Sequence, residues 1–158
     1  MNFSSLEMAS FNVLPHFIAL AIAYLLALPI GWNREKQTRS AGLRTFPLVA
    51  VATCGFVQAG ERIAAGEAEA MARIVEGLIT GMGFIGGGAI LRRGDSVSGT
   101  ATAASLWITG AIGVSVGVEA YDVAVMLSVF TMLTLWLLSP LKRTVADVVE
   151  PADKLIEK

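Results

Sequence analysis

The segment Gly81–Gly86 matches the G-x-G-x-x-G fingerprint of dinucleotide-binding proteins letter for letter. That fingerprint binds a pyrophosphate only where it follows a strand, opens a helix and precedes an acidic residue by about 20 positions. Here it ends a long apolar run and continues into Gly87 and Gly88. We therefore interpret these glycines as helix-packing positions, and we expect no nucleotide or other cofactor.

A second set of residues has the polar chemistry needed for binding or ion passage. We predict a functional polar cluster that comprises Arg34, Glu35, Arg44, Thr45, Asp95 and Thr102. Two interpretations of Arg44 stay open. It either anchors a helix at the lipid surface, or folds into the bundle and pairs with Glu35 or Asp95.

Glu76 is a candidate for an ion-related role. It lies three residues after Arg73, a spacing at which the two side chains can pair on a helix, and this pairing is the simpler interpretation. Further along, Ser98 is predicted as a helix N-cap in a hydroxyl-rich motif. No histidine, cysteine or lysine lies in that motif to activate a hydroxyl, so we expect no enzyme. The sequence identifies no metal ligand set.

These residues must be positioned by a chain that is 54% apolar and only 16% charged over 158 residues. Five long apolar runs cover about 14–32, 45–59, 74–91, 100–118 and 123–141. A spanning helix needs about 20 apolar residues. We predict an all-α integral membrane protein with five transmembrane helices over residues 1–141. A short cytoplasmic tail follows over 142–158, with a brief helix at about 141–149.

Glycines are concentrated in the third and fourth runs, where small residues let membrane helices approach closely. Several are four residues apart. The predicted packing positions are Gly77, Gly81, Gly83, Gly86, Gly87, Gly88, Gly113 and Gly117. We expect the two glycine-rich helices to pack tightly on each other. The three consecutive glycines at 86–88 also suggest a broken helix of the kind that marks ion sites in transporters.

The basic residues predict the orientation. With the amino terminus outside and the carboxyl terminus inside, ten basic residues lie in the cytoplasm and two, Arg62 and Arg73, lie outside. Cytoplasmic loops carry the excess of lysine and arginine in membrane proteins. The opposite orientation would reverse this ratio.

Three motifs occur together: AGLRTFPLV at 41–49, GMGFIGGGAI at 81–90 and GTATAASLWITGAIGVSVG at 99–117. In this order and spacing they resemble the MgtC/SapB family of bacterial inner-membrane proteins, over about residues 30–140. The resemblance implies a five-helix domain in the bacterial plasma membrane and a role in adaptation to low magnesium. It also implies virulence in intracellular pathogens and control of membrane energetics through the ATP synthase.

The chain departs from the family pattern at three places. Asn33 stands where members usually carry a glutamate before the arginine. The fourth helix opens with Gly99-Thr100-Ala101-Thr102 instead of Gly-Leu-Thr-Thr. Founding members also carry a carboxyl-terminal domain of the ACT type. With 18 residues after Pro140, we expect this chain to be a short form without it.

The sequence therefore predicts a non-enzymatic inner-membrane protein linked to magnesium homeostasis and membrane energetics. It would act through helix–helix contacts with itself or with a membrane partner such as the ATP synthase. The alternative is a transporter or channel for magnesium or another ion, with a path at a broken third helix. The expected partners are the lipid bilayer, a second copy of the chain and a membrane protein, with no nucleic acid.

Overall fold

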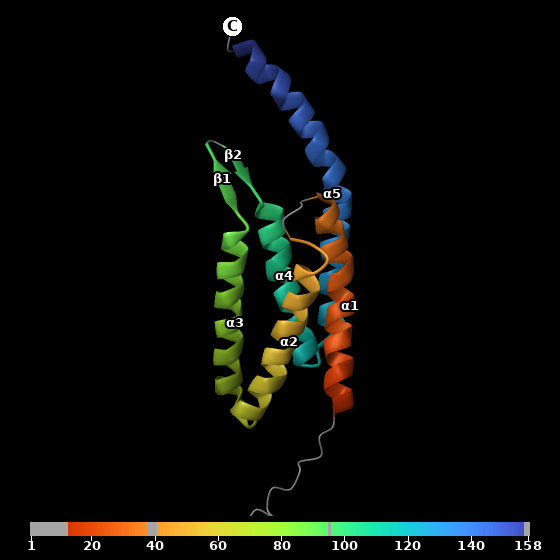
Figure 1. Cartoon of the computed structure of the whole chain (residues 1–158), viewed down its shortest axis with the longest axis vertical. Coiled ribbons are helices and arrows are strands. Elements are labelled where there is room, and N and C mark those ends of the chain that lie inside the picture. The colour runs from red at the N-terminus through yellow and green to blue at the C-terminus, as the bar shows by residue number, and fades with distance from the viewer. Residues whose placement is uncertain (1–12, 38–40, 95, 157–158) are drawn as a thin grey trace, which may run out of the picture.

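The protein is an elongated bundle of five helices (Figure 1). The computed structural model describes residues 13–37, 41–94 and 96–156, without the side chains of Arg93 and of residues 139–156. The elements are α1 (Val13–Gln37), α2 (Thr45–Ala64), α3 (Ala68–Gly88), β1 (Leu91–Arg93), β2 (Ser96–Ser98), α4 (Thr100–Gly117) and α5 (Tyr121–Ile156). Successive helices run in opposite directions, so the end of α1, the beginning of α2, the β-hairpin and the far end of α5 lie toward one end (Figure 1).

Helix α4 is the centre of the bundle and packs against all four other helices. Its Ile112 and Val116 are fully buried. Helix α1 contributes a row of buried alanines at Ala19, Ala23 and Ala27, which are four residues apart and so lie on one side of the helix. Small side chains in such a row let helices approach closely.

Three of the described helices are long and apolar enough to cross a bilayer: Val13–Gln37, Thr100–Gly117 and the part of α5 from Tyr121 to Leu138. Helices α2 and α3 carry charged residues near their shared end, among them Glu61 in α2 and Glu69 in α3. All five predicted helices are confirmed as helices, and three of them as candidate membrane spans.

The polar segment between α3 and α4 is a β-hairpin, which the sequence did not predict. Leu91 pairs with Ser98 and Arg93 with Ser96 in antiparallel register. Gly99 then takes the N-cap position of α4 with a left-handed φ of 86°. A side chain there would overlap the Ala89 carbonyl oxygen. The predicted Ser98 cap is therefore wrong.

Helix α3 runs without interruption from Ala68 to Gly88. The amide of Ala89 still donates to the Gly86 carbonyl at 3.1 Å, so the last turn is intact. Glycines 86–88 thus end the helix next to the hairpin, and the predicted break within it is wrong.

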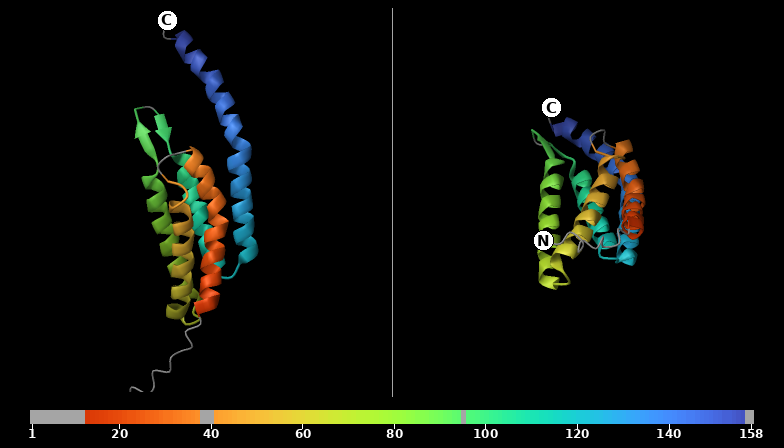
Figure 2. Two further views of the ribbon diagram at one scale, coloured as in Figure 1. Left: turned by 45° about the vertical axis from the view of Figure 1, so that its right-hand side comes forward. Right: turned by 60° about the horizontal axis from the view of Figure 1, so that its bottom comes forward.

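Helix α5 continues through Pro140 to Ile156, a total of 36 residues. The brief separate helix predicted at 141–149 is therefore part of α5. At about 1.5 Å per residue, 36 residues extend over about 54 Å, well beyond the roughly 30 Å hydrocarbon core of a bilayer. The end of α5 projects past the rest of the bundle (Figure 2).

Candidate functional site

Arg34 is the most deeply buried of the described charged residues in the predicted polar cluster. It lies in the last turn of α1 with 6% of its surface exposed. Its Nη2 donates to Asn33 Oδ1 at 2.7 Å. A buried guanidinium is costly unless it is hydrogen-bonded. Asn33, at the position where the family resemblance leads us to expect a glutamate, supplies a neutral acceptor.

Glu35, near the end of α1, is hydrogen-bonded to the residues that lead into α2. Its Oε2 accepts a hydrogen bond from the Leu43 amide at 3.0 Å. Gly42 is buried directly against this side chain, because a Cβ there would overlap Glu35 Oε2 and lie 2.7 Å from Glu35 Cβ. A carboxylate at the amino-terminal end of a helix is favoured by the helix dipole. Glu35 therefore has a structural role in the bundle.

Arg44 lies exposed at the N-cap of α2, followed by the half-buried Thr45. Within residues 13–37, 41–94 and 96–156, no ion pair joins Arg44 to Glu35, whose carboxylate binds the Leu43 amide instead. Asp95 lies outside the described residues, so an Arg44–Asp95 pair stays a prediction. The exposure of Arg44 favours the interpretation of a surface anchor.

Thr102 begins a row of buried hydroxyls along α4. Thr102, Ser105 and Thr109 are 3%, 2% and 0% exposed and recur at a spacing that keeps them on one side of the helix. Ser105 donates to the Ala101 carbonyl at 2.7 Å, and Thr109 donates to the Ser105 carbonyl at 2.8 Å. Both protons stay within α4, and the oxygens keep acceptor capacity. The spacing in the sequence could have predicted this longer row.

A different hydroxyl joins two helices. Ser128 of α5 donates to the Leu26 carbonyl of α1 at 2.8 Å. Nothing in the sequence around Ser128 distinguishes it from a lipid-facing serine, so this contact was missed.

Glu76 is exposed on α3 and is not the partner of Arg73. Arg73 pairs with Glu69 at 2.8 Å, so the predicted Arg73–Glu76 pair is wrong. Across the part of the chain that the structure describes, no group of three or more histidine, cysteine or carboxylate side chains could hold a metal ion.

The glycines of α4 face inward and are tightly filled. A Cβ at Gly113 would overlap both the Ala50 carbonyl oxygen and Thr53 Oγ1 of α2. A Cβ at Gly117 would lie 2.7 Å from Val57 Cβ, again on α2. Helices α2 and α4 therefore pack so closely that a side chain does not fit at either glycine.

The glycines of α3 behave differently. No atom lies within 4 Å of a Cβ built at any of five of them: Gly77, Gly81, Gly83, Gly87 and Gly88. Among the α3 glycines, only Gly86 has α4 close by: a Cβ built there would lie 3.4 Å from the Ala103 carbonyl oxygen, an ordinary van der Waals distance. The predicted tight packing of α3 on α4 through both glycine sets is thus wrong within one chain. Packing of the α3 glycines against another chain stays a prediction.

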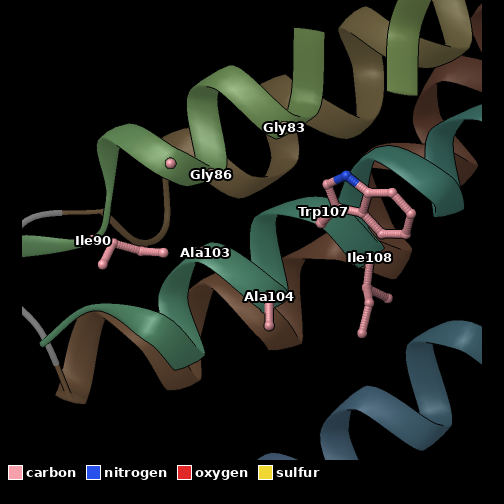
Figure 3. A pocket seen from close by; sticks show the side chains of 8 residues that line it. Gly83, Gly86, Ile90, Ala103, Ala104, Trp107 and Ile108 are labelled. Carbon is pink, nitrogen blue, oxygen red and sulfur yellow. The ribbon is translucent and has the colours of Figure 1, made fainter. Parts of the chain in front are cut away.

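An apolar groove of about 490 Å³ lies between α3 and α4 (Figure 3). In that view, the Trp107 indole lies between the two helices and Ile90 points toward Ala103. The residues that line the groove are Gly83, Gly86, Gly87, Ile90, Ala103, Ala104, Trp107 and Ile108. The groove ends at Ile90, directly before the hairpin.

Comparison with known proteins places the motifs in context. The sequence model of the MgtC family matches residues 20–144. Protein SrpB of Synechococcus elongatus is 38% identical over 128 residues, which cover 73% of this chain and 70% of SrpB. Protein MgtC of Brucella abortus is 38% identical over 77% of this chain and 50% of its own length.

A third relative is the "Putative magnesium transporter YhiD" of Escherichia coli, 34% identical over 75% of this chain and 58% of its own length. The chain thus spans only about half the length of the MgtC and YhiD relatives. No solved structure matches the chain.

Proposed function

This chain belongs to the MgtC family, and we propose that it is a non-enzymatic, multi-pass protein of the bacterial inner membrane that supports magnesium homeostasis and membrane energetics. It acts through contacts between its helices and those of a membrane partner. The candidate partners are a second copy of the chain and a membrane complex such as the ATP synthase. The names of the MgtC and YhiD relatives support the link to magnesium.

In the proposed topology all five helices cross the membrane, with the amino terminus outside. The antiparallel course of the helices supports this, because it brings the end of α1, the start of α2 and β1 toward one end and the connected ends of α2 and α3 to the other (Figure 1). Arg34, Arg44 and Arg92 belong to the first group of segments, and Arg62 and Arg73 to the second. A reporter after Lys158 should therefore be cytoplasmic and one near Gly66 periplasmic. Two reporters on the same side would contradict the five-span topology.

The open glycines of α3 are the observation that carries the proposed mode of action. Glycine costs about 1 kcal/mol relative to alanine in a helix interior. At these five positions no contact within the chain is close enough to give a reason for this cost. A close-packed partner helix supplies one.

Gly77, Gly81 and Gly88 lie within about 40° of one another around the axis of α3. Phe84, which is 87% exposed, lies on the same side. This side of α3 is the proposed partner contact.

The test is growth under magnesium limitation, with the level of the protein in the membrane measured alongside. Gly81→Leu should abolish support of growth at normal abundance, because leucine holds a partner helix away. Ile79→Leu, at a half-exposed position of the same helix, is the matched control. Normal growth of the Gly81→Leu strain would contradict the proposed contact.

Transport of magnesium or another ion is the second candidate, favoured by the name of YhiD and by the buried hydroxyl row that begins at Thr102 near one end of α4. Purified protein in liposomes, under an imposed gradient and potential, distinguishes the two functions. Ion flux that is lost in Thr109→Val would support transport. If no ion flux is detected, contact with a partner helix would remain as the explanation of the growth phenotype.

A further inference from the structure

We propose that the groove between α3 and α4 binds an acyl chain of an anionic phospholipid, whose phosphate lies at Arg92 of the hairpin. This inference rests on the membrane placement proposed above and adds a specific ligand to it. The groove lies on a different side of α3 from the partner contact, since Gly83 and Gly87 are about 120° around the axis from Gly77, Gly81 and Gly88.

The lining of the groove selects a hydrocarbon. All eight lining residues are glycine, alanine, isoleucine or tryptophan, so no side-chain acceptor or charge faces an occupant. The hollow exists because Gly83 and Gly87 lack side chains, and the space beyond each of them is open. A polar ligand would lose its hydrogen bonds to water there without replacement.

The dimensions and place of the groove match the upper part of a lipid chain. Gly83 and Gly87 are four residues apart along α3, or about 6 Å at 1.5 Å per residue, and the groove continues past the end of the helix to Ile90. One end of the groove, at Ile90, adjoins the hairpin, which the proposed topology puts at the cytoplasmic surface. The other end, at Trp107, lies deeper. A chain that enters at Ile90 would run into the membrane in the direction that lipid chains take.

The hairpin supplies the charge. Arg92 is exposed and lies two residues beyond Ile90. Its Nε donates to the Gly94 carbonyl at 3.1 Å, which holds the side chain against its own turn. Its Nη nitrogens make no hydrogen bond to any described residue and are open to a phosphate, which guanidinium binds through paired N–H donors. An anionic headgroup complements this charge better than a zwitterionic one.

A helix of a second copy fits the groove less well. The Trp107 indole, 48% exposed, lies between α3 and α4 (Figure 3). A helix would have to displace it to reach Gly83, whereas a flexible chain can pass beside it.

The experiment uses tryptophan fluorescence in vesicles. One variant keeps only Trp107 (Trp32→Phe with Trp136→Phe), and a reference variant keeps only Trp136, which is 71% exposed on α5. Each is reconstituted in phosphatidylcholine with a minor fraction of lipid whose acyl chains are brominated, either phosphatidylglycerol or phosphatidylcholine. Bromine quenches only a nearby indole.

We expect brominated phosphatidylglycerol to quench Trp107 about five-fold more effectively than brominated phosphatidylcholine, the preference that one arginine provides at an anionic surface. Trp136 should be quenched equally by both lipids. Arg92→Gln, a change on the exposed hairpin, should abolish the preference at Trp107. Gly87→Leu should fill the groove and reduce quenching by either lipid, while Gly77→Leu, also at an open glycine but outside the groove, should not.

Equal quenching of Trp107 by the two lipids, or a preference that survives Arg92→Gln, would overturn the lipid site. A disulfide between two chains in Gly87→Cys, made with Cys54→Ala, would assign the groove to a second copy instead. Failure of any brominated lipid to quench Trp136 would contradict the membrane placement itself, and so separates the two proposals.

Discussion

Helices α3 and α4 are both rich in glycine, yet they use it in opposite ways. In α4, Gly113 and Gly117 are buried against the backbone and side chains of α2, and no side chain fits at either position. In α3, Gly77, Gly81 and Gly88 have empty space beyond their Cα atoms. The same residue type in the same kind of spacing thus serves the fold of the chain in one helix and is free for another molecule in the next.

This difference separates stability from function. A substitution at Gly113 or Gly117 should damage the fold itself, because backbone and side-chain atoms of α2 occupy the space that a new side chain would need. A substitution in the α3 set should leave the fold intact and change only what the outer side of α3 contacts. The effect of both kinds of substitution on the free energy of unfolding can be measured in the purified protein.

The largest effect is expected at Gly113. Gly113→Ala puts a Cβ onto the Ala50 carbonyl oxygen, and overpacking of this kind should destabilise the protein by about 3 kcal/mol. Thermal unfolding in detergent micelles measures it. Gly88→Ala is the matched control and should be neutral or stabilising by up to about 1 kcal/mol, since alanine is the better helix former. Equal melting temperatures for the two variants would contradict the claim that glycine is tightly packed in α4 and open in α3.

A second filled glycine extends the comparison to the α1–α2 connection. Gly42→Ala would push Glu35 from its hydrogen bond with the Leu43 amide, at a cost of about 2 kcal/mol in the same unfolding experiment. Glu35→Gln keeps the shape of the side chain and a weaker acceptor, so it should lose less. A Gly42→Ala protein as stable as the wild type would show that the hydrogen bond between Glu35 and the Leu43 amide does not contribute to stability.

The outer side of α3 gives the reverse pattern. Gly81→Leu should not destabilise the isolated protein, because no atom lies within 4 Å of a Cβ at this position. Leucine is the better helix former, so the free energy of unfolding should rise by up to about 1 kcal/mol. Strong destabilisation of Gly81→Leu in isolated protein would show that α3 packs inside the chain after all.

The smallest effect is expected for Arg44→Lys. Because its side chain is exposed, Arg44→Lys should behave as the wild type, and Arg44→Ala should cost less than about 1 kcal/mol in unfolding experiments. A loss of about 3–5 kcal/mol in Arg44→Ala would instead reveal a buried pair, for which Asp95 is the candidate.

The five helices could be predicted from sequence because the apolar runs are long and the charges between them are sharply clustered. The side of each helix that meets a neighbour could not. A spacing of four residues predicts that Gly77 and Gly81 lie on the same side of one helix, and that Gly113 and Gly117 lie on the same side of another. Which side is covered depends on how α2 lies against α4, and that is a property of the assembled bundle.

The polar site was predictable only in part. Arg34 and Thr102 were identified, but their burial depends on how the helices pack against one another. The hairpin was missed because its strands have three residues each, and the left-handed turn residue Gly94 carries little signal in a glycine-rich segment. The Arg73 pair was assigned to Glu76 because both partners are compatible with helical spacing, and the structure selects Glu69.

Site-specific photo-crosslinking at Phe84 tests whether a partner helix lies against the open glycines of α3. A benzophenone amino acid replaces Phe84, on the open side of α3, or Phe130, which is 61% exposed on α5. After irradiation of native membranes, we expect one discrete adduct from position 84, lost when Gly81→Leu is added, and none from position 130. The same adducts from both positions, or none from position 84, would contradict the claim that the glycines of α3 are kept open for a partner helix.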